Sequence, residues 1–196
     1  EIKECDWSSD VCSFRSTIIG IPLYGYFVGF TTFDWILAFV MYVVTGMGIT
    51  VGYHRLVSHQ SFECPDWVKR CALIAGGWAL QNSALIWCAD HIRHHARTDT
   101  DEDPYNASRG FWHSHCGWLF YETPHRTDKY EIRLRRDPVI LWQHRYYWAI
   151  VVSGLAIPFA LGVWWHQGWM GGVSALLLGG DRKSTRLNSS HIPLSR

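Results

Sequence analysis

The chain has 196 residues, a length that usually corresponds to one domain. Its 18 Lys and Arg nearly balance 17 Asp and Glu, which argues against a nucleic-acid-binding protein because such proteins present a basic face. The six cysteines form no CxxC pair, so neither a disulfide framework nor a thiolate zinc site is predicted. The mean hydropathy of −0.06 resembles that of a soluble protein, but twelve Trp and eleven His indicate membrane interfaces and metal binding instead.

The two ends of the chain differ in character from its middle. Residues 1–16 and 181–196 resemble translated reading frames of a sequencing-library adapter; a polar disordered tail is the alternative interpretation. Because such ends do not belong in an argument about the fold, we predict adapter-like tails over 1–16 and 181–196. The domain is then expected over 17–180, as part of a longer sequence.

Long uncharged segments follow one another along this domain. They cover residues 17–33, 35–53, 71–89, 146–165 and 167–180. About 20 apolar residues span a bilayer as a helix, so the pattern predicts an all-α integral membrane protein. A soluble all-α protein with buried helices is the alternative, although core helices seldom remain uncharged over nineteen residues several times in one chain.

The segment 71–89 is expected not to cross the membrane. Lys and Arg flank it on both sides, and the positive-inside rule then places both flanks in the cytoplasm. Gln81, Asn82 and Ser83 in its middle are costly in lipid. We therefore predict a re-entrant or interfacial helix that packs on protein.

Five histidines form two spaced clusters, His54 with His59, and His91 with His94 and His95. On an α-helix the second cluster lies within about 100° on one face. The first pair is about 140° apart, so both could reach one metal only if the helix ended or unwound near Leu56. The uncharged segment between the clusters does not cross, so both clusters are expected on the same side.

The number of these histidines exceeds what one zinc ion binds, which suggests a two-metal site. Imidazole suits zinc, copper, iron and nickel, so the residue types alone leave the metal open. Competing motifs fail: Pro124 interrupts the Glu-x-x-His pattern at Glu122 and His125, and no HExxH, GxSxG or P-loop occurs.

Several stretches together resemble the membrane fatty-acid desaturases of the acyl-CoA delta-9 (stearoyl-type) group. The resemblance covers about residues 17–180, so the predicted domain is a partial fatty-acid desaturase domain. The matching stretches are 48–59 (GITVGYHRLVSH), 90–101 (DHIRHHARTDTD), 103–106 (DPYN), 109–118 (RGFWHSHCGW), 137–138 (DP) and 143–148 (QHRYYW).

The resemblance implies a four-helix transmembrane bundle under a cytoplasmic helical cap that holds a His-rich di-iron site. It implies an O2-dependent oxidoreductase that introduces a cis double bond, expected at delta-9, into a fatty acyl chain. The electrons would come from a cytochrome b-type protein or a ferredoxin with its reductase. The implied location is a bacterial inner membrane or the endoplasmic reticulum, with the active site facing the cytoplasm.

The resemblance also implies roles for single residues. The implied iron ligands are His54, His59, His91, His94 and His95. Asn82 and Asp90 match positions that contact the acyl carrier or the chain near it, and Trp87 matches a residue that lines the substrate tunnel. Packing at the interface is the alternative for Trp87, and satisfying the backbone of the re-entrant segment is the alternative for Asn82. The remaining histidines considered are expected not to bind metal: His113, His115, His125, His144 and His166.

The chain departs from the family pattern in three places. A further His-x-x-His-His box is absent, so we expect the 196-residue chain to be inactive and to bind iron weakly. Glu122 and Thr123 replace a basic pair associated with CoA phosphates, and Ala89 replaces an Arg. The sequence therefore leaves open whether the acyl chain is carried by CoA, by acyl carrier protein or by a lipid. A membrane di-iron hydroxylase or alkane monooxygenase is the rival enzyme, and a membrane zinc-binding, receptor-like protein is the rival without catalysis.

Overall fold

The computed structural model describes residues 19–98, 100, 110 and 129–180, and all regular secondary structure in these ranges is helical. The predicted all-α class is therefore confirmed for this part of the chain. The elements are α2 (Ile21–Phe27), α3 (Thr32–Met47), η2 (Gly48–Ser58), α4 (Asp66–Gly77), α5 (Ala84–Arg97), α7 (Lys129–Leu134), α8 (Pro138–Arg145), α9 (Tyr147–His166) and α10 (Trp169–Gly180). The predicted tails over 1–16 and 181–196 lie outside the described residues.

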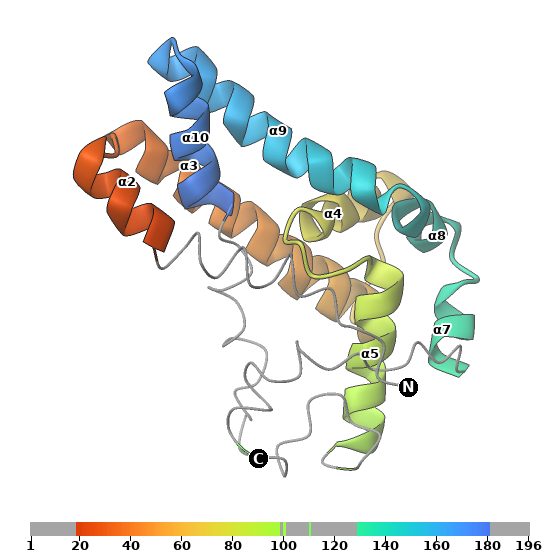
Figure 1. Cartoon of the computed structure of the whole chain (residues 1–196). Coiled ribbons are helices and arrows are strands. Elements are labelled where there is room, and N and C mark those ends of the chain that lie inside the picture. The colour runs from red at the N-terminus through yellow and green to blue at the C-terminus, as the bar shows by residue number, and fades with distance from the viewer. Residues whose placement is uncertain (1–18, 99, 101–109, 111–128, 181–196) are drawn as a thin grey trace, which may run out of the picture.

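Helices α3, α9 and α10 form one arm of the molecule, and α5 points away from it (Figure 1). Helix α10 packs against both α9 and α3. Helix α3 begins where Asp34 Oδ2 accepts hydrogen bonds of 2.8 Å from the backbone N–H and the hydroxyl of Thr31, and η2 continues it without a break to Ser58. Helix α9 ends at Gln167, which adopts a left-handed conformation with φ 54°.

Two of the described helices are long and apolar enough to cross a membrane, the continuous helix Thr32–Ser58 and Tyr147–His166. Only 33% and 28% of their most apolar windows are buried, and large side chains such as Phe39 and Trp148 are 67% and 74% exposed. Soluble proteins rarely expose so much contiguous apolar surface. The exposed apolar arm is what a lipid-facing surface requires. The predicted bundle of four spans stays a prediction.

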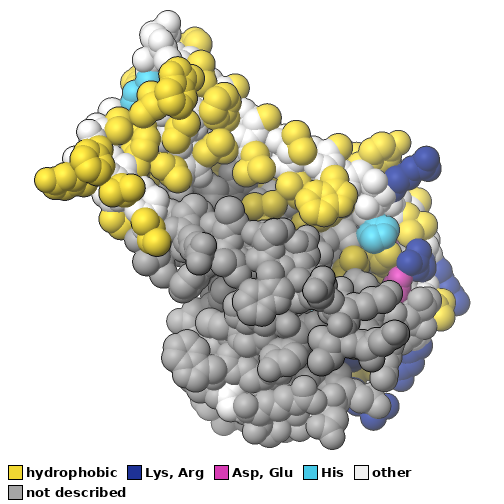
Figure 2. Space-filling view, viewed as in Figure 1, with side chains coloured by type: hydrophobic (Ala, Val, Ile, Leu, Met, Phe, Trp, Pro, Cys, Tyr) yellow, Lys and Arg dark blue, Asp and Glu magenta, His cyan; other side chains and the backbone are white. Residues whose placement is uncertain are grey.

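On the face shown in Figure 2, basic side chains gather at one end of the molecule. Figure 2 shows hydrophobic side chains over the arm of α2, α9 and α10, whereas Lys and Arg gather near α7 and α8. This segregation matches a protein with one end in lipid and a basic end in water.

The segment 71–89 is not one helix, so that part of the prediction is wrong. Helix α4 ends at Gly77 and α5 begins at Ala84, and between them Leu80 and Asn82 adopt left-handed conformations with φ 60° and 73°. Two left-handed residues within three positions are incompatible with a continuous α-helix. The chain therefore turns here, and α5 leads its histidines away from α4.

The main core lies where η2, α4, α5 and α8 meet. Its fully buried side chains include Tyr53, Leu73, Leu85 and Cys88. Helices η2 and α4 approach so closely that a Cβ on Gly48 would lie 2.2 Å from the backbone nitrogen of Gly76. Only glycine permits this contact, which packs the start of η2 directly against α4.

Candidate metal centre

Two histidines of the cluster come from η2, an 11-residue π-helix that carries His54 and has His59 as its C-cap residue. The backbone N–H of His59 donates to the carbonyl of His54 at 3.0 Å, which is the i→i+5 bond that defines a π-helix. Residues five apart therefore share a face, and the two Nε2 atoms lie 3.1 Å apart. The expected end or unwinding near Leu56 takes this form: the helix is widened to a π-helix and ends at Ser58, directly before His59, which keeps both histidines on one side.

Helix α5 supplies the other histidines. His91 and His95 are one α-helical turn apart, and their Nε2 atoms lie 3.1 Å from each other. His59 links the two helices, since its Nε2 atom is 3.3 Å from that of His91. One ring nitrogen from each of His54, His59, His91 and His95 falls within 4.8 Å of the others.

This spacing fits the ligand set of one metal ion. Two nitrogens bound at about 2.1 Å in a tetrahedral arrangement lie about 3.4 Å apart, close to the 3.1–3.3 Å found here. Neutral imidazole has one nitrogen without a proton, and in the tautomer that leaves Nε2 unprotonated all four rings could bind one cation. All-imidazole donor sets suit iron, zinc, copper or nickel.

The environment keeps the buried imidazole in its metal-binding, neutral form. His91 is 7% exposed, and burial, followed by the neighbouring His54 and His95, lowers its pKa from 6.5 to about 3. Burial and the adjacent His59 and His94 also lower the pKa of His95. Neutral imidazole is the ligand form, so His91 can bind a cation over the whole physiological pH range.

His94 is placed differently from the other four predicted ligands. It lies on α5 next to His95, with ring centroids 5.6 Å apart, but it does not belong to the convergent group. The structure thus brings together four of the five predicted histidines. A second ion, for which His94 was also predicted as a ligand, stays a prediction.

The three residues predicted to bind substrate differ in their contacts with the histidine cluster. Trp87 stacks on the ring of His91, with centroids 4.9 Å apart and an interplanar angle of 12°. Asn82 is exposed in the turn before α5. Asp90 is half-buried and accepts a hydrogen bond from Arg93 on the next turn. Trp87 therefore contacts a predicted ligand directly.

Histidines predicted not to bind metal have other partners where the structure describes them. His144 Nδ1 lies 2.7 Å from the Ser83 hydroxyl, and His166 Nε2 lies 3.1 Å from Asp34 Oδ1. His113, His115 and His125 lie outside the described residues, as do the departures at Glu122 and Thr123.

Sequence reasoning assigned no role to Tyr53 and Gln143. Tyr53 is fully buried directly before His54, and its hydroxyl accepts a 2.8 Å hydrogen bond from Gln143 Nε2. The signal available was that both residues occur in stretches that resemble the family, 48–59 and 143–148. Nothing in the spacing of these stretches indicates that they meet.

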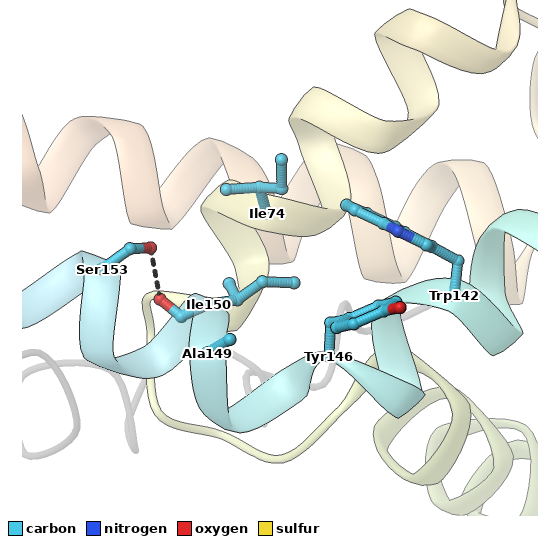
Figure 3. Close-up of a pocket in the computed structure, with 6 residues that line it drawn as sticks. All are labelled: Ile74, Trp142, Tyr146, Ala149, Ile150 and Ser153. Atoms are coloured by element: carbon cyan, nitrogen blue, oxygen red, sulfur yellow. Dashed lines mark hydrogen bonds between the residues drawn. The ribbon is translucent and has the colours of Figure 1, made fainter.

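A shallow apolar groove of about 320 Å³ lies apart from the histidines, between α4 and the junction of α8 with α9 (Figure 3). The Ser153 hydroxyl in its lining donates a 2.7 Å hydrogen bond to the carbonyl of Ile150. The lining residues are Ile74, Trp142, Tyr146, Ala149, Ile150 and Ser153. No histidine of the convergent group contributes to this lining.

Residues 33–180 match the family model for fatty acid desaturase. The chain belongs to the fatty acid desaturase family. This membership agrees with the resemblance stated for the sequence, and the four convergent histidines all lie within the matched desaturase region.

Individual relatives are desaturases of acyl lipids and acyl-CoA. The chain is 35% identical over 161 residues to the sn-2 palmitoyl-lipid 9-desaturase of Nostoc sp. (strain 36), covering 70% of this chain and 56% of the relative. It is 36% identical over 136 residues to a probable acyl-CoA desaturase of Schizosaccharomyces pombe, covering 66% and 28%. It is 35% identical over 159 residues to an acyl-CoA Delta(11) desaturase of Trichoplusia ni, covering 75% and 45%. The chain thus spans about half the length, or less, of these curated relatives.

Proposed function

We propose that this protein takes part in the O2-dependent desaturation of a fatty acyl chain, with the double bond at delta-9. The convergence of four imidazole nitrogens within 4.8 Å carries the proposal, in a chain that belongs to the fatty acid desaturase family. The relatives named for 9-desaturation support the position of the double bond.

The proposed cofactor is a pair of iron ions held mainly by histidine. His54, His59, His91 and His95 fit one ion, and His94 is proposed as a ligand of the second. Imidazole-bound iron supplies the oxidising chemistry for an unactivated methylene pair. In the balanced reaction, –CH2–CH2– gives –CH=CH– while O2 takes up two external electrons and two protons and leaves as two water molecules.

The residues around the cluster would position the substrate. The indole of Trp87, stacked on His91, offers a flat apolar wall for an acyl chain beside the proposed iron. Asn82, in the turn before α5, and Asp90, on α5, are proposed to contact the acyl carrier. If the carrier is bound at one place and the acyl chain lies against this wall, the same methylene pair always faces the metal. The position of the double bond is then fixed by the distance from the carrier.

We propose a multi-pass membrane location with the histidine cluster on the cytoplasmic side. The exposed apolar surfaces of Thr32–Ser58 and Tyr147–His166 support insertion. The basic side chains near α7 and α8 support a cytoplasmic orientation of that end. The proposed electron donor is a cytochrome b-type protein or a ferredoxin with its reductase, and the acyl carrier is CoA, acyl carrier protein or a glycerolipid.

The test is the complete reading frame of the gene, expressed in cells supplied with deuterated stearate. A cis-9 alkene, dependent on O2 and lost in His91→Ala but not in His166→Ala, is the expected product. An alcohol instead of an alkene would identify a hydroxylase. Purified protein that holds one redox-silent zinc and no iron would overturn the proposal altogether.

A further inference from the structure

Gln143 is a fully buried amide that reaches three elements around the histidine cluster. Its Nε2 group donates to the Tyr53 hydroxyl at 2.8 Å and to the carbonyl of Leu73 at 3.4 Å. Its Oε1 atom accepts from the backbone N–H of Ala84 at 3.0 Å. Both N–H groups and the carbonyl of the amide are thus bonded, which fixes its orientation without ambiguity.

These partners stand next to the proposed ligands in the chain. Tyr53 directly precedes His54 on η2, and Ala84 is the first residue of α5, two helical turns before His91. The bond across Gln143 therefore sets how far the start of α5 lies from the ligand-bearing turn of η2. The Tyr53 hydroxyl also donates to the carbonyl of Asn82 at 3.4 Å, which closes the link between the two helices.

Two neighbours of Gln143 hold the same turn. His144 bonds to the Ser83 hydroxyl at 2.7 Å, and the Tyr147 hydroxyl accepts from the backbone N–H of Asn82 at 3.1 Å. Residues 82, 83 and 84 are thus each held by a side chain from the stretch 143–147. An α-helix leaves its first N–H groups without partners inside the helix. At the start of α5, side chains from the end of α8 and the beginning of α9 bond to this segment.

We propose that Gln143 is a positioning residue for the metal centre: by joining Tyr53 to Ala84 it holds η2 and α5 at the spacing that lets their histidines share one ion. This inference rests on the proposed metal centre. It assigns to Gln143 no contact with metal or substrate. Outer partners of metal ligands typically change affinity about 10–100-fold when removed.

The test measures Co²⁺ binding by the full 196-residue chain in detergent, through the visible absorption of the bound ion. Gln143→Met keeps the volume but removes all three hydrogen bonds, and we expect about tenfold weaker binding and a shifted absorption band at unchanged helix content. Tyr53→Phe removes only the hydroxyl that Gln143 contacts and should weaken binding in the same direction. Gln143→Glu keeps the acceptor for the N–H of Ala84 and, in its protonated form, can still donate to the Tyr53 hydroxyl, so it should restore most of the affinity.

Ser153→Ala is the matched control. It removes the 3.0 Å hydrogen bond from Trp78 Nε1 to Ser153, which also joins two elements, but it touches neither η2 nor α5. We expect its Co²⁺ affinity to equal that of the unchanged chain. An equal loss in Ser153→Ala and Gln143→Met would show general loosening and would overturn the proposal.

A readout that needs no metal separates the positioning role of Gln143 from the existence of the metal centre. Diethyl pyrocarbonate modifies accessible imidazoles, and His91 is 7% exposed, so it should react slowly in the unchanged, metal-free chain and faster in Gln143→Met and Tyr53→Phe. Unchanged His91 reactivity together with unchanged Co²⁺ affinity in Tyr53→Phe would overturn the role of Gln143, even if Gln143→Met fails to fold. Absence of Co²⁺ binding in the unchanged chain, with faster His91 modification in the variants, would instead overturn the metal centre alone.

Discussion

His54 and His59 face the same point because the helix that carries them is a π-helix. The N–H of His59 bonds to the carbonyl of His54 at 3.0 Å, and their Nε2 atoms lie 3.1 Å apart. The Ser58 hydroxyl makes the parallel contact one residue earlier, donating to the carbonyl of Tyr53 at 2.9 Å. Short π-helical segments occur preferentially at functional sites, and this one aligns two side chains that an α-helix would separate.

Moving the second histidine by one residue tests this geometry. In the double variant Ser58→His/His59→Ser the histidines are four apart, a spacing that suits an α-helix but not η2. We expect its Co²⁺ affinity to fall as far as that of His59→Ala, measured by titration of the visible absorption. Ser58→Ala is the control and should bind nearly as well as the unchanged chain. A double variant that binds as well as the unchanged chain would show that η2 is α-helical in solution.

The metal-free chain should lose stability in acid. The folded pKa of His91 is about 3, below its unfolded value of about 6.5, so the unfolded chain binds more protons between these values. Stability therefore rises with pH across this window and is lost as pH falls from about 6.5 towards 3, by up to about 1.4 kcal/mol per pH unit. Denaturant unfolding at a series of pH values, with a chelator present, measures the slope.

The variant His91→Asn is the check on that assignment. It removes the titrating group, so its stability should depend less on pH between about 3 and 6.5. The same slope in both proteins would show that His91 does not carry the effect. Helix content measured at neutral pH confirms that the variant is folded before the comparison.

The pair Asp34 and His166 should stabilise the fold without affecting metal binding. Asp34 is 1% exposed and bonds both to Thr31 and to His166, at the opposite end of the continuous helix from the histidine cluster. Asp34→Ala removes these charge-assisted hydrogen bonds, including the cap at Thr31, and should lower the free energy of unfolding by about 1–3 kcal/mol. Co²⁺ affinity of the folded variant should not change, and a tenfold loss would contradict the separation of the two ends.

Insertion into a membrane should depend on the exposed face of α3. Val43 is 42% exposed on the long apolar helix, and an arginine there should raise the apparent free energy of insertion by about 2.5–3.5 kcal/mol. Glycosylation mapping in microsomes measures Val43→Arg against the unchanged chain. Trp67→Arg, at a 68% exposed position of α4, should insert normally. Equal insertion of all three proteins would show that this face does not meet lipid.

The sequence alone determined the local features of this protein. The i, i+4 spacing of His91 and His95 indicated a shared helix face, and the structure places their Nε2 atoms 3.1 Å apart. The uncharged segments indicated an all-α protein, and the two histidine stretches carried the family resemblance that the family model confirms. Such features depend on residues close together in the chain, whose geometry follows from helix periodicity.

Tertiary structure decided where helices widen, turn and meet. The close approach of Gly48 and Gly76 packs η2 against α4, and the π-helical hydrogen bond from His59 to His54 brings these two side chains together, against α-helical periodicity. The left-handed turn at Leu80 and Asn82 separates α4 from α5, and Gln143 bonds to Tyr53 across 90 positions of the chain. These contacts depend on which distant segments pack together, so the histidine cluster is assembled by long-range packing of locally encoded helices.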